Sequence, residues 1–210
     1  MQEQTLDFFN QVDASEVAAA AADVRQGGSP NPFGVEVPVV VTIDTDVELV
    51  ENTGIEETEA VFTISEGERT YQVQLGTAIY GEDKAALYAE AKAVEAGKRT
   101  KDQKQTMKFA GISRGKLHQL FAAALPGYET RLLEKVGTKW QATDMDGNPM
   151  DKDQRDEAEK TREAKLNKIL AAWQKGEHLG ILKGKQVTYV PMKNEKNPSF
   201  PYHSFRAVNS

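Results

Sequence analysis

The alternation of apolar and polar residues predicts a group of β-strands in the first half of the chain. Apolar residues occupy most alternate positions from Val35 to Val50, a period typical of strands with one buried face. Two further runs, Ala60 to Ile64 and Thr70 to Leu75, flank a short connection that contains Gly67. A glycine in so short a connection favours a hairpin, so we expect three or four antiparallel strands here.

The period then changes to that of amphipathic helices. Apolar residues recur every three or four positions after Glu82, which predicts a helix that Gly97 ends. A second helix is expected to begin after Ser113, as its N-cap, and to end at Pro126. A short third helix is expected from Glu129 to Val136.

Two more helices are predicted near the ends of the chain. The second half of the run from Asp151 to Lys175 has an apolar stripe, whereas its first half is polar and is expected to project into solvent or to contact a partner. Asp13 and Glu16 have the spacing of a capping box and open an alanine-rich run that extends to Val24. Residues 1–34 are therefore expected to form an N-terminal helix and a linker.

The chain returns to a β-type pattern at its end and carries two basic segments. Gln186 to Val190 and Tyr202 to Val208 predict a hairpin around the loop from Lys193 to Pro201, in which lysines accompany Asn, Pro and Ser. The other basic segment, Lys98 to Lys116, has seven basic residues and a single acidic one, Asp102. Because its first half has no apolar stripe, we expect a flexible loop that becomes ordered on a phosphate backbone.

Composition excludes several classes of function. With 210 residues, of which 39% are hydrophobic, the chain suffices for one well-buried domain. It has no cysteine and three widely spaced histidines, so we expect no metal, no other cofactor and no catalytic site, although carboxylates distant in sequence can still meet in a fold. No apolar run reaches the length of a membrane span and the first residues lack a secretion signal, so a cytoplasmic location without membrane contact is expected.

The charge is distributed unevenly along the chain. Residues 1–68 contain fifteen acidic residues and one basic residue, Arg25, a balance of −14. The net charge of the whole chain is −6, which leaves +8 for residues 69–210. Such asymmetry often accompanies nucleic-acid binding, in which the acidic part either forms a solvated surface or confines the nucleic acid to the basic surface.

The order of the predicted elements suggests a family. Strands, a helical section, the segment Leu182 to Val190 and a basic hairpin that ends with Tyr202 to Val208 resemble, in organisation, phage-encoded OB-fold single-stranded DNA-binding proteins. The resemblance covers roughly residues 35–80 and 181–208. It implies an α+β fold, a five-stranded OB-like β-barrel with an N-terminal helix and a large helical insertion at about residues 84–178, before the C-terminal hairpin. Residues 35–210 would then form a single domain.

The resemblance also implies a function and partners. Proteins of this family coat single-stranded DNA without enzymatic activity during replication, recombination and repair. The expected partners are single-stranded DNA, further copies of the chain, and replication or recombination proteins in the host cytoplasm. One alternative is a phage structural or assembly protein, in which the sheet and the polar helix from Asp151 contact neighbouring subunits. Another is a protein that inhibits or modulates a host enzyme through its acidic N-terminal third.

Two kinds of side chain are the candidate DNA contacts, because single-strand binders combine cations for the backbone with rings on which bases stack. Since successive strand residues face opposite sides, about half of the aromatic candidates should lie in the core. The basic candidates are Lys98, Arg99, Lys101, Lys104, Lys108, Arg114, Lys116, Lys185, Lys193, Lys196 and Arg206. The aromatic candidates are Tyr71, Tyr80, Tyr189, Phe200 and Tyr202.

Overall fold

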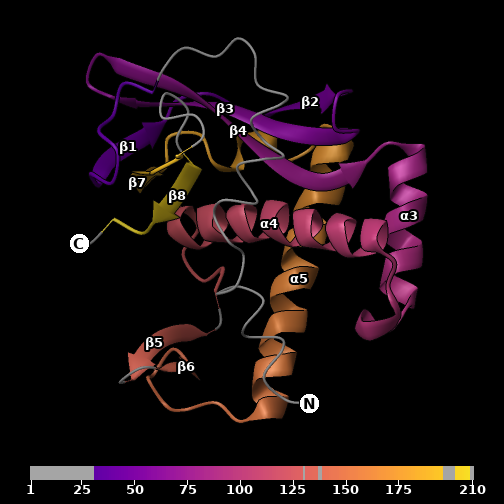
Figure 1. Ribbon diagram of the computed structural model, residues 1–210. Coiled ribbons are helices and arrows are strands. Elements are labelled where there is room, and N and C mark those ends of the chain that lie inside the picture. Colours follow the sequence, from indigo (N-terminus) through magenta and orange to yellow (C-terminus); the bar gives the residue numbers. More distant parts are fainter. Residues whose placement is uncertain (1–30, 130, 137–138, 196–201, 209–210) are drawn as a thin grey trace.

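The fold is a mixed α+β arrangement in which helices pack against an open antiparallel sheet (Figure 1). The computed structural model describes residues 31–129, 131–136, 139–195 and 202–208. The predicted helix from Asp13 to Val24 lies outside these residues. The strands of the main sheet are β1 (Val39–Ile43), β2 (Glu48–Asn52), β3 (Glu57–Glu66), β4 (Arg69–Tyr80), β7 (Gln186–Met192) and β8 (Tyr202–Arg206).

Strands β1 and β2 behave as one interrupted strand along an edge of β3. Both are antiparallel to β3, and Thr42 pairs with Ser65 whereas Leu49 pairs with Ala60. The opposite edge of β3 pairs with β4 over its whole length. The β3–β4 hairpin expected at Gly67 is therefore confirmed, and the glycine has the positive φ of 58° that the turn requires. On its other side β1 pairs with β7, which pairs with β8, so the predicted C-terminal hairpin also forms.

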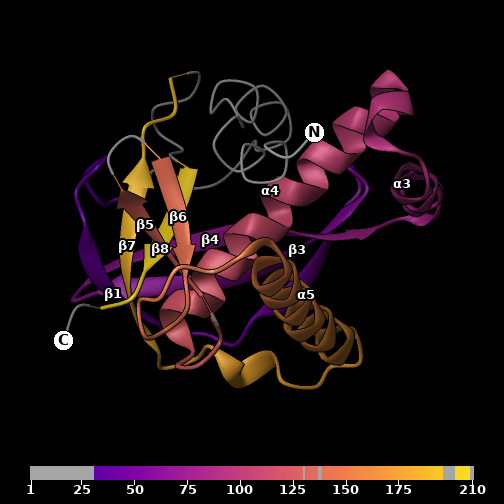
Figure 2. The same cartoon turned by 90° about the horizontal axis from the view of Figure 1, so that it is seen from below.

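The sheet does not close into a barrel. Within the described residues no ladder joins β4 to β8, so the structure shows an open six-stranded sheet where a five-stranded barrel was expected. Helix α4 (Lys101–Ala124) packs along both of these strands; it lies below the sheet in Figure 1 and runs across the front of it in Figure 2, which is seen from below. Its apolar residues Leu117, Leu120 and Phe121 belong to the core, so the helix covers apolar surface that sheet closure would otherwise bury.

The expected flexible loop from Lys98 to Lys116 is wrong, because most of this segment belongs to α4. Thr100 caps the helix in a capping box. Its hydroxyl accepts a hydrogen bond from the backbone N–H of Gln103, and the Gln103 side-chain oxygen accepts one from the backbone N–H of Thr100. The segment contains five Lys and two Gln, residues that favour helices. Its inner face carries the small residues Thr106 and Ala110, which fit close against neighbouring elements but form no conspicuous apolar stripe. The predicted start after Ser113 is thus more than three turns too late.

The other connecting elements include one further correction. Helix α3 (Glu82–Ala93) agrees with the prediction, whereas the predicted helix from Glu129 to Val136 is wrong and gives strand β5 (Leu132–Val136). This strand pairs with β6 (Lys139–Thr143) in a separate hairpin. The segment is too short for its apolar residues to show a helical or a strand period, so the pairing decides its secondary structure. Helix α5 (Lys152–Gln174) follows, and single turns of 3-10 helix lie at Ala96–Lys98 and Leu179–Ile181.

The core lies between the sheet and the inner faces of α4 and α5. Leu166, Leu170 and Trp173 form the apolar stripe predicted for the second half of α5, and all three are buried. The polar first half is not simply solvated, since Glu159 forms an ion pair with Arg131. Among the described helices, none combines the length and the apolar character needed to span a bilayer.

Candidate functional site

A cleft of about 340 Å³ lies where α4 meets β4 and β8, the two strands at the open edges of the sheet. Strands β3 and β4 form one side, the start of α3 adds Lys84, and β8 contributes Tyr202 and His203. The floor is α4, which runs from the α3 side of the molecule to the β7–β8 side (Figure 2). The cleft therefore follows the open seam between β4 and β8 and is built from segments far apart in sequence.

Helical periodicity places one face of α4 in this cleft. Gln105, Phe109, Ile112 and Lys116 follow each other at intervals of four, three and four residues, and all line the cleft. Beside this face, toward the exposed side of α4, lies a row of three lysines, which we call the lysine row: Lys101, Lys104 and Lys108. Lys101 and Lys104 are exposed, and Lys108 is half-buried. The lysine row thus leads along the helix into the cleft.

Lys116 is the most unusual charge in the cleft. Its amine donates a hydrogen bond to the backbone carbonyl of His203 on β8. Within the described part of the chain, no carboxylate forms an ion pair with it. Burial lowers the pKa of Lys116 from 10.5 to about 8, because the charged form loses hydration and gains no counter-charge. An ammonium in this state favours an anionic ligand, which would supply the missing charge.

The acidic residues of the cleft have structural partners. The Glu57 Oε1 accepts the Ala78 amide at 2.8 Å, and Ser113 on α4 also hydrogen-bonds this carboxylate. Burial raises the pKa of Glu57, and these hydrogen bonds oppose that rise only in part. The Glu59 carboxylate accepts a bond of 3.3 Å from the Asn52 amide. Both carboxylates would repel a phosphate, so this part of the cleft suits a neutral polar group.

The start of α3 contributes a second amine to the cleft. Lys84 donates a hydrogen bond of 2.6 Å to the Ile55 carbonyl and lies 4.5 Å from the centre of the Tyr80 ring. Burial lowers the pKa of Lys84. Because the Tyr80 ring contacts Lys84 and packs edge-on against Tyr88 at 5.5 Å, it is less accessible for stacking than an isolated surface ring.

The aromatic candidates divide between core and cleft. Tyr71 and Tyr189 are core residues, 9% and 0% exposed, so neither ring can stack on a base. Tyr202 is half-buried and lines the cleft. Tyr80 lies beside the cleft on its α3 side, next to Lys84. Two of the four aromatics that the structure describes are therefore core residues, in line with the alternation of strand faces. Phe200 lies outside the described residues.

Three of the basic candidates are engaged within the protein. Arg114 contacts the Glu163 carboxylate on α5 through two of its nitrogens, and its side chain is only 15% exposed. The Arg99 Nε donates a hydrogen bond of 2.8 Å to the Ala91 carbonyl. Lys98 pairs with Glu95 at 2.9 Å in an exposed position. Arg114 thus joins α4 to α5, and Arg99 fixes the connection between α3 and α4 to α3, whereas the Lys98 pair is weak and does not prevent other contacts.

The basic candidates of the C-terminal hairpin lie apart from the cleft lining. Lys185 and Arg206 are exposed, and Lys193 is exposed with Glu195 at 3.4 Å. None of these three lines the cleft. Lys196 lies outside the described residues. Lys116 lies on α4, and its hydrogen bond to the His203 carbonyl joins it directly to this hairpin.

The sequence reasoning missed the uncharged side chains of the cleft. Gln105, Phe109 and Ile112 were assigned to a loop, although together with Lys101, Lys108 and Lys116 they share one helical face. That spacing was visible in the sequence, but the lysines within it obscured the apolar positions. Gln74 on β4 also lines the cleft. Its place there depends on how closely α4 approaches the sheet, which local sequence patterns do not reveal.

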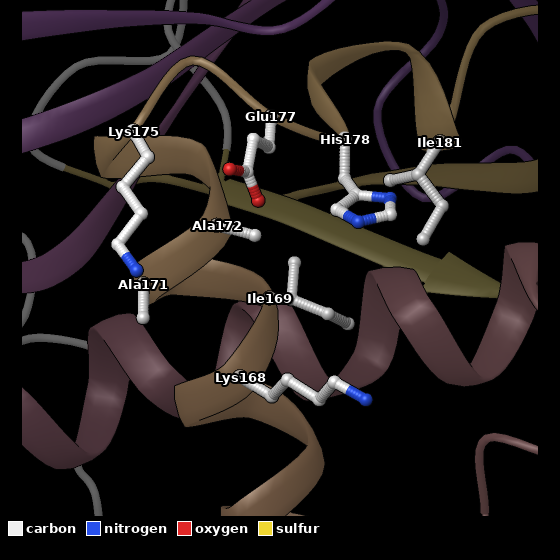
Figure 3. A pocket seen from close by; sticks show the side chains of 8 residues that line it. All are labelled: Lys168, Ile169, Ala171, Ala172, Lys175, Glu177, His178 and Ile181. Atoms are coloured by element: carbon white, nitrogen blue, oxygen red, sulfur yellow. The ribbon is translucent and has the colours of Figure 1, made fainter.

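A second hollow, of about 380 Å³, lies at the end of α5 (Figure 3). Glu177, His178 and Ile181 point toward the helix turns that carry Ile169 and Ala172. Lys168 and Lys175 flank it, and its lining includes no ring of Phe, Tyr or Trp. It lacks the continuous row of cations found on α4, so we assign it no role.

Comparisons with known proteins leave the cleft to be interpreted from its own chemistry. No protein-family model, no curated protein and no solved structure is found to match the chain. In the described segments, no group of three or more His, Asp or Glu side chains is placed to hold a metal ion.

Proposed function

We propose that the protein binds single-stranded DNA along the exposed face of α4, with phosphates on the lysine row and bases at the cleft. The observation that carries the proposal is the position of the lysine row on α4, directly beside the cleft face that holds the ammonium of Lys116. Cations in a row attract a polyanion, and each phosphate that they neutralise releases counterions. The proposed role is non-enzymatic coverage of exposed strands during replication, recombination or repair.

The strand connectivity supports the resemblance to OB-folds. If β1 and β2 count as one interrupted strand, the order is β4–β3–β1–β7–β8, with the helical section between β4 and β7. A five-stranded OB-fold that is open between its third and fifth strands has this order, and OB-folds are partly open barrels. We propose that the sheet is an OB-like barrel whose seam is filled by α4 in place of a β4–β8 ladder.

The chemistry of the cleft supports a preference for a single strand over a duplex in this proposal. Phe109 and Tyr202 present rings at its lining, and base faces can reach such rings only when they are free of their paired strand. The carboxylates of Glu57 and Glu59 lie beside them and would repel the backbone of a duplex pressed into the cleft. A single strand can keep its phosphates on the lysine row and turn a base inward.

Fluorescence anisotropy tests the proposal. A labelled single strand and the matching duplex are titrated with the full chain over a salt series from about 50 to 200 mM, a range in which backbone binding weakens steeply. We expect tighter binding of the single strand and a linear fall of log K with log salt. Absence of binding to either DNA at the lowest salt would refute the proposal. A defined oligomer by light scattering in that case would favour the assembly protein.

A further inference from the structure

We propose that the cleft receives one unstacked nucleotide of the bound strand, with its phosphate at Lys116 and its base against Phe109 and Ile112. This inference rests on the proposed function and adds a specific subsite to it. Its starting point is geometric: Gln105 and Lys116 lie on the same face of α4, eleven residues apart, or about 16 Å along the helix axis. The cleft between them is long enough for the phosphate and the base of a nucleotide to contact different side chains.

The two ends of the cleft differ in chemistry. At the β8 end, the Lys116 ammonium uses one of its three donors on the His203 carbonyl and keeps two for a phosphate. At the opposite end of this α4 face, the cleft is lined by the neutral amide of Gln105, which suits the polar edge of a base, whereas the Glu57 carboxylate lies between the two ends, beside Ser113. The nucleotide is therefore oriented with its phosphate toward β8.

The middle of the cleft is apolar. Phe109, Ile112 and Leu75 line it, so a base ring that contacts them would be removed from water on both of its faces. The volume of about 340 Å³ is at the small end of the range for ligand pockets, which favours one base over a stack of bases. A single base turned out of the strand satisfies the size and the apolar surface together.

The first measurement uses modified oligonucleotides. A single strand and the same strand with abasic sites at every second nucleotide are compared by anisotropy. We expect the abasic strand to bind the wild-type chain about tenfold more weakly, because the cleft loses its base. Ile112→Phe, which fills the cleft without removing a side chain from the core, should make the two strands bind alike. Gln119→Ala, on the exposed side of α4, should keep the difference.

The second measurement tests the phosphate position through the pH. Binding of a phosphate to Lys116 keeps the amine protonated, so affinity should fall as the pH rises from 7 to 9, the interval in which the free amine loses its proton. Lys116→Met should bind more weakly at pH 7 and lack this fall. The other titratable groups that line the cleft are Glu57, Glu59, Lys84, Tyr202 and His203. Lys84→Met is the control for the second amine and should retain the fall.

The two proposals fail in different ways. If neither strand binds at low salt, the proposed function is wrong. If both strands bind with the expected salt dependence, but the abasic penalty is absent or is unchanged in Ile112→Phe, the DNA-binding function stands and the nucleotide subsite is refuted. A pH dependence that persists in Lys116→Met refutes the assignment of the phosphate to that residue. Thermal unfolding of each variant identifies any change that only reflects loss of folded protein.

Discussion

Gly76 on β4 and Ser113 on α4 approach each other so closely that no side chain fits between them. A Cβ atom at Gly76 would lie 2.4 Å from the Ser113 Oγ and 2.5 Å from the Glu57 Oε1. The same carboxylate accepts the amide of Ala78, whose φ of 56° marks the irregular end of β4. The helix, the strand and the buried acid are thus positioned by one close contact.

Gly76→Ala should destabilise the protein by about 1 to 3 kcal/mol, the usual cost of overpacking. The added methyl group must displace the Ser113 hydroxyl or the Glu57 carboxylate and so break their hydrogen bonds. Denaturant unfolding measures the change. Gly97→Ala is the matched control, since a Cβ there meets nothing within 4 Å, and it should change stability little. The double variant with Ser113→Ala should recover part of the loss; no recovery would contradict the steric explanation.

Reversal of the lysine row should weaken DNA binding without harm to the fold. The triple variant Lys101→Glu, Lys104→Glu and Lys108→Glu removes three of the proposed phosphate contacts. We expect roughly tenfold or greater loss of affinity at about 100 mM salt and a salt slope reduced by about 2, as each single-strand contact contributes about 0.7. Lys101 and Lys104 lie at the start of α4, where acidic residues are favourable, so these two substitutions should not harm the fold.

The control for this variant changes the same number of charges on α5. Lys152, Lys160 and Lys168 are exposed lysines of that helix, and their substitution by Glu alters the net charge equally. A nonspecific effect of net charge would weaken binding in both triple variants. A specific effect of the α4 face would leave the DNA affinity of the α5 variant close to that of the wild type. Equal losses of affinity in the two triple variants would contradict the assignment of the binding surface to α4.

Glu163 links α4 to α5 and should make the protein sensitive to acid. Its Oε1 lies 2.9 Å from the His118 Nε2, and its Oε2 accepts from the Arg114 guanidinium. Burial alone would raise the pKa of Glu163, but the hydrogen bonds from His118 and Arg114 lower it to about 2. Because the folded-state pKa lies below the ordinary 4.5, the stabilisation is complete above about pH 4.5 and is lost as the pH falls toward 2.

Glu163→Gln should therefore reduce stability at pH 7 by roughly 1 to 2 kcal/mol, since it leaves the Arg114 charge without its partner. The difference from wild type should shrink as the pH is lowered through the range in which Glu163 gains its proton. Urea unfolding at several pH values measures both effects. Glu157→Gln, at an exposed position of the same helix, is the control. A constant difference at all pH values would rule out the ion pair as the cause.

Tyr189 tests the distinction between core and cleft. Its hydroxyl accepts a hydrogen bond of 2.7 Å from the Asn31 amide and lies 3.0 Å from the His203 Nδ1. Tyr189→Phe should cost about 1 to 3 kcal/mol of stability, because it leaves buried polar groups without this partner. The affinity for single-stranded DNA, measured where the variant is fully folded, should stay within about twofold of wild type. A large loss of affinity would return this ring to the binding surface.

Local patterns in the sequence determined most of the strands and two of the helices. The alternation from Val35 to Val50, the glycine turn at Gly67 and the stripe of α5 each reflect a burial pattern that repeats with the period of one element. The failures are also local. Thr106 and Ala110, which lie on the buried face of α4, are small residues, so this face could not be recognised among the lysines of the sequence. The run at β5 was too short to show its period.

Only the tertiary structure decided where the charges and rings meet. From its sequence alone, Lys116 is one of seven basic residues in a window, but the approach of α4 to β8 buries its amine against the His203 carbonyl and lowers its pKa. Strand pairing turns Tyr189 into the core, and α4 lines the seam between β4 and β8, which no ladder joins in the described part of the chain. Sequence records the periods of elements, whereas the environment of a side chain depends on segments that the chain brings together from far apart.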